Sequence, residues 1–86
     1  MTDAEFNSLR SGDKVCVQGY QIKFDARVSG PHNSLGEIPI EVVQVHWRAD
    51  DLDYVYKDYR RGHRTTEQNR PALMRGWISE GVRRWD

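Results

Sequence analysis

The chain has a single cysteine, no net charge and no long apolar run, and each shortage excludes a class of protein. Cys16 is alone among 86 residues, so an intrachain disulfide and a cysteine-based zinc site are both excluded. Hydrophobic residues make up 37% of the chain, and no stretch is long and apolar enough to cross a membrane. The first residues also lack the basic and apolar regions of a signal peptide. We therefore expect a cytoplasmic protein with no membrane partner.

Aromatic residues are plentiful for so polar a chain: three Trp, four Tyr and two Phe. Each aromatic ring buries a large area, so we expect rings to supply much of the core. A length of 86 residues fits one domain, in which every large apolar residue matters for stability.

The clearest pattern is a strict alternation between residues 22 and 28. Ile22, Phe24, Ala26 and Val28 are apolar, and the residues between them are charged. Successive side chains point to opposite faces of a strand, so this segment predicts a sheet with one buried and one solvent-facing side.

Other elements follow from shorter patterns. Asp3–Leu9 predicts a helical turn capped by Thr2 or Asp3. The glycines, proline and asparagine of 29–36 predict a loop. The predicted strands are Lys14–Gln18, Ile22–Val28 and Glu37–Arg48. The apolar pattern of the third strand changes phase midway, which predicts a β-bulge near Val42–Val43.

Two later segments each allow two interpretations. Residues 52–61 have a Tyr-Val-Tyr centre that favours a strand pairing with the third one, but their apolar spacing also fits a helix. Residues 69–81 predict a C-terminal helix, with Asn69 as its cap and Gly81 at its end. The alternative there is a turn followed by a hairpin over 77–85.

A turn and a short strand precede the alternating segment, with the sequence Leu9-x-Ser11-Gly12-Asp13-Lys14-Val15-x-Val17-x-Gly19. Together with the alternating strand, this run resembles the opening of SH3-like barrels of the KOW type. The resemblance covers residues 9–48. It implies a small bent barrel whose strand faces and loops bind RNA, DNA or protein partners, and no individual binding residue is carried over.

The expected fold class is α+β: a small bent antiparallel sheet, forming an SH3-like partial barrel of four or five strands, with a C-terminal helix. We expect a single domain over 1–86, with a β-rich part at 9–61 and a helical segment at about 69–81. The expected core is Ile22, Phe24, Val28, Ile40, Val45, Trp47, Leu73 and Trp77.

Catalytic and metal-binding motifs are not found. Cys16 is two residues from Lys14 and lies on the same face of the predicted strand, but no motif pairs it with a histidine. His32, His46 and His63 are too widely spaced for a typical metal site. We expect no catalytic residue, no metal and no cofactor, and hence a protein that is not an enzyme.

The charges are distributed unevenly. Residues 1–56 carry five basic and nine acidic side chains, and 57–86 carry eight basic and four acidic ones. The two halves can neutralise each other on folding, or the second half can present a basic face to an anionic partner.

Bases and aromatics interleave between 56 and 64, which favours a non-enzymatic binding module that contacts nucleic acid or a nucleoprotein assembly. Arginines would contact phosphates and Tyr59 would stack on a base. The candidate nucleic-acid-binding residues are Lys57, Tyr59, Arg60, Arg61 and Arg64.

The alternative is a small protein-binding adaptor or inhibitor, of the mobile-element-encoded, anti-defence sort. It would contact a basic protein surface through an acidic hairpin and exposed aromatics. Its candidate residues are Asp50, Asp51, Asp53 and Tyr54. The C-terminal residues around Trp85 are also suited to a homodimer interface.

Overall fold

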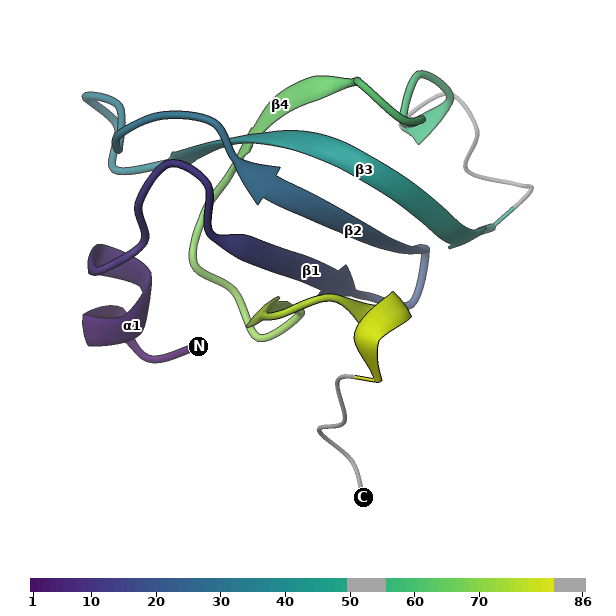
Figure 1. The fold of residues 1–86 in the computed structure, drawn as a ribbon, viewed down its shortest axis with the longest axis horizontal. Coiled ribbons are helices and arrows are strands. Elements are labelled where there is room, and N and C mark those ends of the chain that lie inside the picture. The colour runs from purple at the N-terminus through teal and green to yellow at the C-terminus, as the bar shows by residue number, and fades with distance from the viewer. Residues whose placement is uncertain (50–55, 82–86) are drawn as a thin grey trace.

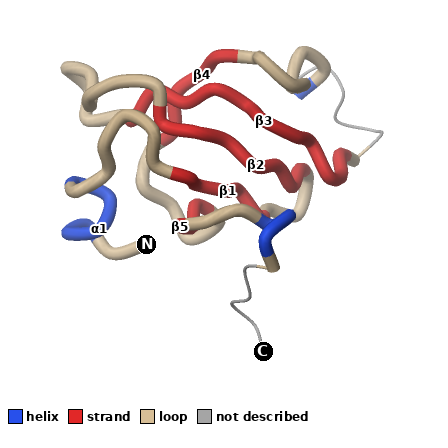
Figure 2. Tube along the Cα trace, viewed as in Figure 1, coloured by secondary structure: helices blue, strands red, loops and turns tan. Residues whose placement is uncertain are grey.

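The computed structural model describes residues 1–49 and 56–81 of the chain. They form a small, mostly β domain with one antiparallel sheet in the order β4-β3-β2-β1-β5 (Figure 1). Strands dominate the regular structure; short helices lie near the chain ends, and Tyr56, in the turn before β4, is also helical (Figure 2). The elements are α1 (Asp3–Asn7), β1 (Lys14–Gln18), β2 (Ile22–Val28), β3 (Ile38–Arg48), β4 (Arg64–Glu67), β5 (Leu73–Arg75) and the 3-10 helix η2 (Ile78–Glu80).

The alternation along β2 is confirmed as the basis of the sheet. Its four apolar residues are at most 1% exposed and lie on the same face as Val15 and Val17 of β1. The face that carries Lys23 and Arg27 is called the outer face below. Asp25 lies on that face too, yet it is fully buried, which the alternation alone does not predict.

The predicted bulge near Val42–Val43 is confirmed, and a second irregularity follows it. Ala26 pairs with Val42 and Asp25 with Gln44, so Val43 has no partner opposite on β2. The register shifts again at His46, between Val45 and Trp47. Each extra residue reverses which face the following side chains occupy and bends the strand, which is visible in β3 (Figure 1).

The second shift explains why one predicted core residue lies outside the core. Trp47 pairs with Lys23 on the outer face and is 47% exposed, so its prediction as a core residue is wrong. Val45 is partly buried and packs against the core, and Trp77 is partly buried on the outer face. The remaining predictions are confirmed as buried: Ile22, Phe24, Val28, Ile40 and Leu73.

The predicted helix over 69–81 is wrong. Residues 73–75 instead form β5, and its backbone pairs with the free edge of β1. Strand addition satisfies β1 backbone groups that a packed helix would leave unpaired. Of the apolar residues at helical spacing in this segment, Leu73, Met74, Trp77 and Ile78, only Leu73 is fully buried. Gly76, with φ of 92°, then turns the chain towards η2. In the alternative hairpin over 77–85, residues 78–80 are a 3-10 turn, and 82–85 lie outside the described residues.

On the edge of β3 opposite β2, the paired strand is β4. Ile38 to Glu41 pair with Glu67 to Arg64. In the described part of the segment 52–61, which is 56–61, Tyr56 is helical and a turn follows it, so the predicted strand is not formed there. Residues 52–55 lie outside the described residues.

The N-terminal turn is confirmed and covers one end of the core. Thr2 and Glu5 form a reciprocal capping box, and Phe6 and Leu9 are 4% exposed. The loop 29–36 contacts this turn through His32, whose Nε2 lies 3.0 Å from the carbonyl oxygen of Phe6. Among the described residues, none of the helices has the length and apolar character needed to span a bilayer.

Candidate binding surface

The turn between Tyr56 and β4 carries four cationic side chains, which we call the basic turn: Lys57, Arg60, Arg61 and Arg64, all of them exposed. Backbone hydrogen bonds fix this turn to the sheet. The N–H of Gly62 donates to the carbonyl of Val42 at 2.8 Å, and the N–H of Val42 donates to the carbonyl of His63 at 2.8 Å. Gly62 has φ of 91°, a conformation in which a side chain would be strained. The cations therefore project from a defined backbone.

Arg48, at the end of β3, is the second anchor of the basic turn. Its Nη1 donates to the carbonyl of Tyr56 at 2.7 Å and lies 3.3 Å from the carbonyl of Tyr59. A guanidinium that binds carbonyls at the end of a helical turn stabilises that turn through hydrogen bonds and the local dipole. Sequence reasoning missed Arg48, because no local motif links it to residues eight and eleven positions later.

Tyr59 packs inward. Its ring centroid lies 5.5 Å from that of Phe24, 5.0 Å from Tyr56 and 4.6 Å from His63. Its hydroxyl lies 3.5 Å from Oγ1 of Thr65. The ring therefore contributes to the packing beneath the basic turn, and the exposed members of the predicted set are the four cations.

The cations of the second half fall into two groups. Arg70 makes two hydrogen bonds to the carboxylate of Glu67, at 2.9 and 3.0 Å, and Arg75 lies 3.6 Å from Asp13. Burial lowers the pKa of the Arg70 guanidinium, but the hydrogen bonds that it donates to Glu67 and its attraction to that carboxylate outweigh burial, so the pKa is raised. For Arg70, the folded chain does neutralise its own charge, whereas Arg75 forms a longer and more exposed pair with Asp13.

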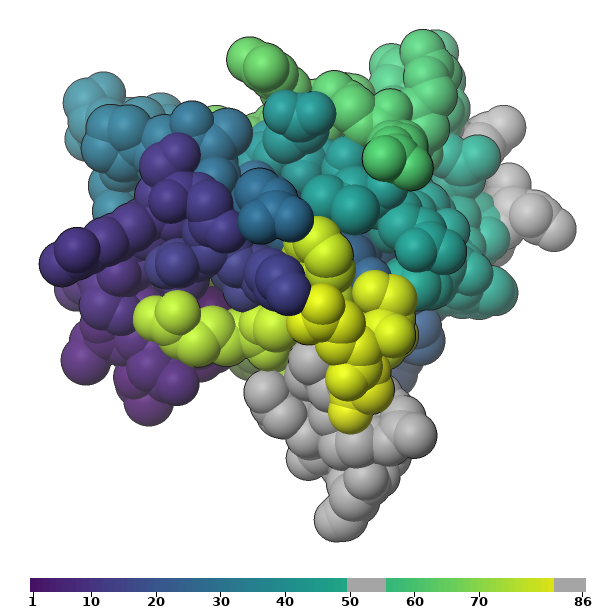
Figure 3. All heavy atoms as spheres, in the orientation of Figure 1, coloured from purple at the N-terminus to yellow at the C-terminus, as the bar shows by residue number. Residues whose placement is uncertain are grey.

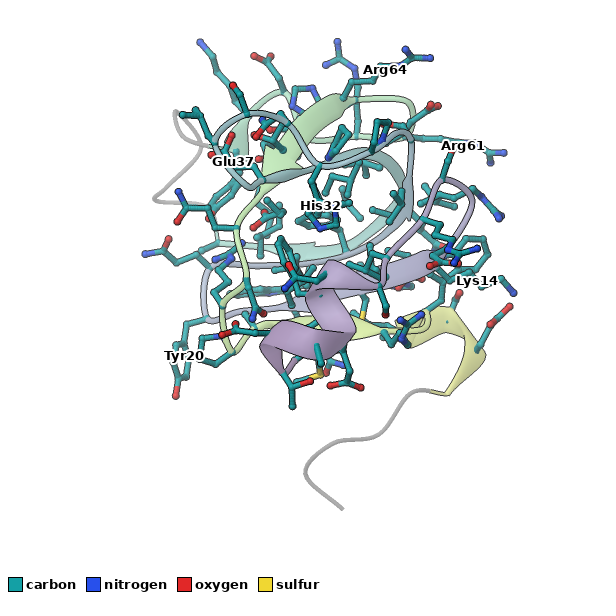
Figure 4. All side chains as sticks on the ribbon, turned by 90° about the vertical axis from the view of Figure 1, so that its left-hand side faces the viewer. Lys14, Tyr20, His32, Glu37, Arg61 and Arg64 are labelled. Carbon is teal, nitrogen blue, oxygen red and sulfur yellow. The ribbon has the colours of Figure 1, made fainter. Side chains whose placement is uncertain are left out.

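The basic turn is different. Arg64 lies 3.6 Å from Glu41, but both side chains are exposed, at 78% and 43%, and such pairs contribute little. Within residues 1–49 and 56–81, Arg60 and Arg61 form no ion pair. Arg61 and Arg64 point away from the fold (Figure 4). This part of the surface is thus basic, and its guanidinium groups are accessible to an anionic ligand.

A hollow adjoins the basic turn, along the part of β3 that extends past β4. The ladder of β4 ends at Glu41, so the following stretch of β3 has no strand on that side among the described residues. The hollow is lined by Val43, Gln44, Val45, Arg48, Tyr59, Arg60 and Arg61.

On the outer face, the C-terminal segment is held by a buried carboxylate that sequence reasoning did not single out. Asp25 accepts hydrogen bonds from the backbone N–H groups of Ile78 at 2.6 Å and Ser79 at 3.1 Å. It also lies 2.8 Å from Nε2 of His46, whose side chain is 23% exposed. The yellow atoms of this segment lie across the sheet between β1 and β3 (Figure 3).

Trp77 completes this attachment. Its Nε1 donates to the carbonyl of Ala26 at 2.8 Å, and Lys14 Nζ and Arg27 Cζ lie 4.7 and 4.8 Å from its ring centroid. The polar side chains of Asp25, His46 and Trp77 thus all take part in holding the C-terminal segment on the sheet. Cys16, which pairs with Asp25 in the β1–β2 ladder, is fully buried.

Among the described residues, no group of three or more His, Cys, Asp or Glu side chains is arranged to hold a metal ion. The residues of the alternative protein-binding prediction, Asp50, Asp51, Asp53 and Tyr54, lie outside the described residues.

Comparisons of the chain with protein-family models, with curated proteins and with solved structures found no match.

Proposed function

We propose that this protein is a non-enzymatic binding module that contacts the phosphate backbone of nucleic acid through the basic turn. The observation that carries the proposal is that Arg60 and Arg61 are exposed, on an anchored backbone, and form no ion pair with any described carboxylate. Guanidinium groups bind phosphate through paired hydrogen bonds, and a fixed backbone reduces the entropy lost on binding.

The chemistry of the basic turn suits a polyanion better than an isolated carboxylate. Between residues 57 and 66 the chain has five cationic or imidazole side chains and one acid, Asp58. Several adjacent cations release condensed counterions when they meet a phosphate backbone, and this release supplies most of the affinity of sequence-independent binding.

We also retain the likeness to SH3-like barrels as part of the proposal. The two register shifts that bend β3 and the return of β5 to the free edge of β1 both support a partly closed sheet of that kind.

The test is a salt series with labelled single-stranded and duplex oligonucleotides. The wild-type dissociation constant should rise steeply with salt. Replacing Arg60, Arg61 and Arg64 together by alanine should weaken binding and reduce the log–log salt slope by about 0.9 per lost duplex phosphate contact and about 0.7 per lost single-strand contact.

Arg61→Ala and Arg10→Ala form a matched pair, because each removes one exposed arginine and Arg10 lies in the turn between α1 and β1. Only Arg61→Ala should change the slope. A wild-type protein that binds neither oligonucleotide, or a triple variant with the wild-type slope, would show that the basic turn does not bind phosphates.

A further inference from the structure

An exposed tryptophan lies on the strand that supports the basic turn. Trp47 is 47% exposed, although tryptophan is among the residues that gain most from burial. The register shift at His46 places it on the outer face, opposite Lys23 of β2. One of the three tryptophans of the chain therefore lies at the surface.

The contacts of Trp47 do not give it a structural role comparable to that of Trp77. Trp77 donates a hydrogen bond from its indole and packs against two cations. In the described part of the chain, Trp47 makes one ring contact, with Lys23 Nζ at 5.5 Å from its centroid, and no indole hydrogen bond. A large aromatic surface therefore stays open beside a cation.

The position of Trp47 connects it to the basic turn. The next residue, Arg48, pairs with Ile22 and so lies on the other face of β3, where it binds carbonyl groups of the basic turn and lines the hollow with Arg60 and Arg61. Arg61 projects on the same side of the molecule as Lys14 of the outer face, whereas Tyr20 projects on the opposite side (Figure 4). Arg61 thus projects to the side of the molecule that carries the outer face, on which Lys14, Lys23 and Trp47 lie.

We propose that the ligand of the basic turn is single-stranded nucleic acid, and that Trp47 stacks on one of its bases while Arg60 and Arg61 contact neighbouring phosphates. This inference rests on the proposed function and specifies its ligand. In a duplex, the faces of the bases are covered by their neighbours, so a ring beside the phosphate contacts has nothing to stack on. In a single strand the faces are open, and stacking on aromatic side chains is a main source of affinity.

The test compares Trp47→Ala with wild type on a deoxythymidine homopolymer and on a duplex of the same length. We expect single-strand affinity to fall about 5- to 150-fold, the range for loss of one base–aromatic stack, with duplex affinity unchanged. The salt slope should not change, because no phosphate contact is lost. Trp47→Phe should retain most of the single-strand affinity.

Tyr20→Ala is the matched control. Tyr20 is 98% exposed and lies on the side of the molecule opposite Arg61 (Figure 4), so its removal should leave both affinities within about twofold. Circular dichroism melting verifies that each variant is folded.

The two proposals fail in different ways. If the arginine variant reduces the salt slope but Trp47→Ala leaves single-strand affinity unchanged, or lowers duplex affinity equally, the phosphate contacts stand and the stacking role of Trp47 is wrong. If the wild-type protein binds no oligonucleotide, both proposals are wrong, and this surface has another partner.

Discussion

The attachment of the C-terminal segment to the sheet depends on one buried carboxylate. In Asp25→Ala, the part-buried N–H groups of Ile78 and Ser79 lose their acceptor, a fully buried carboxylate. A hydrogen bond to a charged group contributes about 1.5–3 kcal/mol, so the loss of both costs about 3–6 kcal/mol. Domains of this size have a total stability of about 4–13 kcal/mol, so this variant loses much or all of its native population.

Asp25→Asn is the more informative variant, because it preserves shape. One oxygen can still accept from Ile78, and the new NH2 group can face Nε2 of His46 if the imidazole changes tautomer. The N–H of Ser79 is then left without an acceptor. The loss of this part-buried hydrogen bond to a charged group costs about 1.5–3 kcal/mol, and a loss of about 2 kcal/mol lowers the Tm of a domain this small by about 8–16 °C.

Urea unfolding, followed by circular dichroism and by tryptophan fluorescence, measures the free energy of unfolding directly. Asp58→Asn is the control, since it removes the same charge from an exposed side chain and should change stability by less than about 0.5 kcal/mol. If Asp25→Asn unfolds at the same urea concentration as Asp58→Asn, the Asp25 carboxylate does not hold the C-terminal segment on the sheet.

Two further predictions concern the cap of α1 and the anchor of the basic turn. Hydrogen bonds from the backbone and side chain of Thr2 lower the pKa of Glu5 below its usual value of 4.5. This contribution is complete above the unfolded-state pKa and is lost as pH falls through the folded-state pKa, so Glu5→Gln should flatten the decline of Tm in that acid range. Arg48→Met removes the 2.7 Å hydrogen bond to Tyr56 and should cost about 1.5–3 kcal/mol in urea unfolding. It should also weaken oligonucleotide binding, and unchanged binding would show that the basic turn keeps its position without this anchor.

Elements whose signals are local were predictable from the sequence. The alternation from Ile22 to Val28 fixes one face of β2, and its bounds agree with the structure. The capping residues of the first helix are also adjacent in sequence. The phase change at Val42–Val43 indicated a bulge because both apolar runs had to reach the same core. In each case the residues that decide the structure lie within a few positions of one another.

The predictions that are wrong concern segments whose structure depends on residues far away in the sequence. The segment from Leu73 has an apolar spacing that fits a helix, but the free edge of β1, more than fifty residues earlier, provides hydrogen-bonding groups that turn it into a strand. Similarly, Trp47 was expected in the core because a second register shift at His46 has no signature of its own. Intrinsic propensity is a weak guide when tertiary pairing is available.

In the candidate site, too, local composition was predictable from the sequence, whereas the pairing of individual charges depends on distant residues. The cations of residues 57–64 were visible as a composition, yet composition could not distinguish neutralised from available charges. Arg70 and Arg75 have carboxylate partners, while Arg60 and Arg61 have none among the described residues. Their backbone is held by Val42 and Arg48, which flank the hollow, so the bent part of β3 both anchors the turn and exposes Trp47. The second register shift places Trp47 on the outer face, and the stretch of β3 from Val42 to Arg48 holds the basic turn, so one bent strand supports both the cations and the open ring.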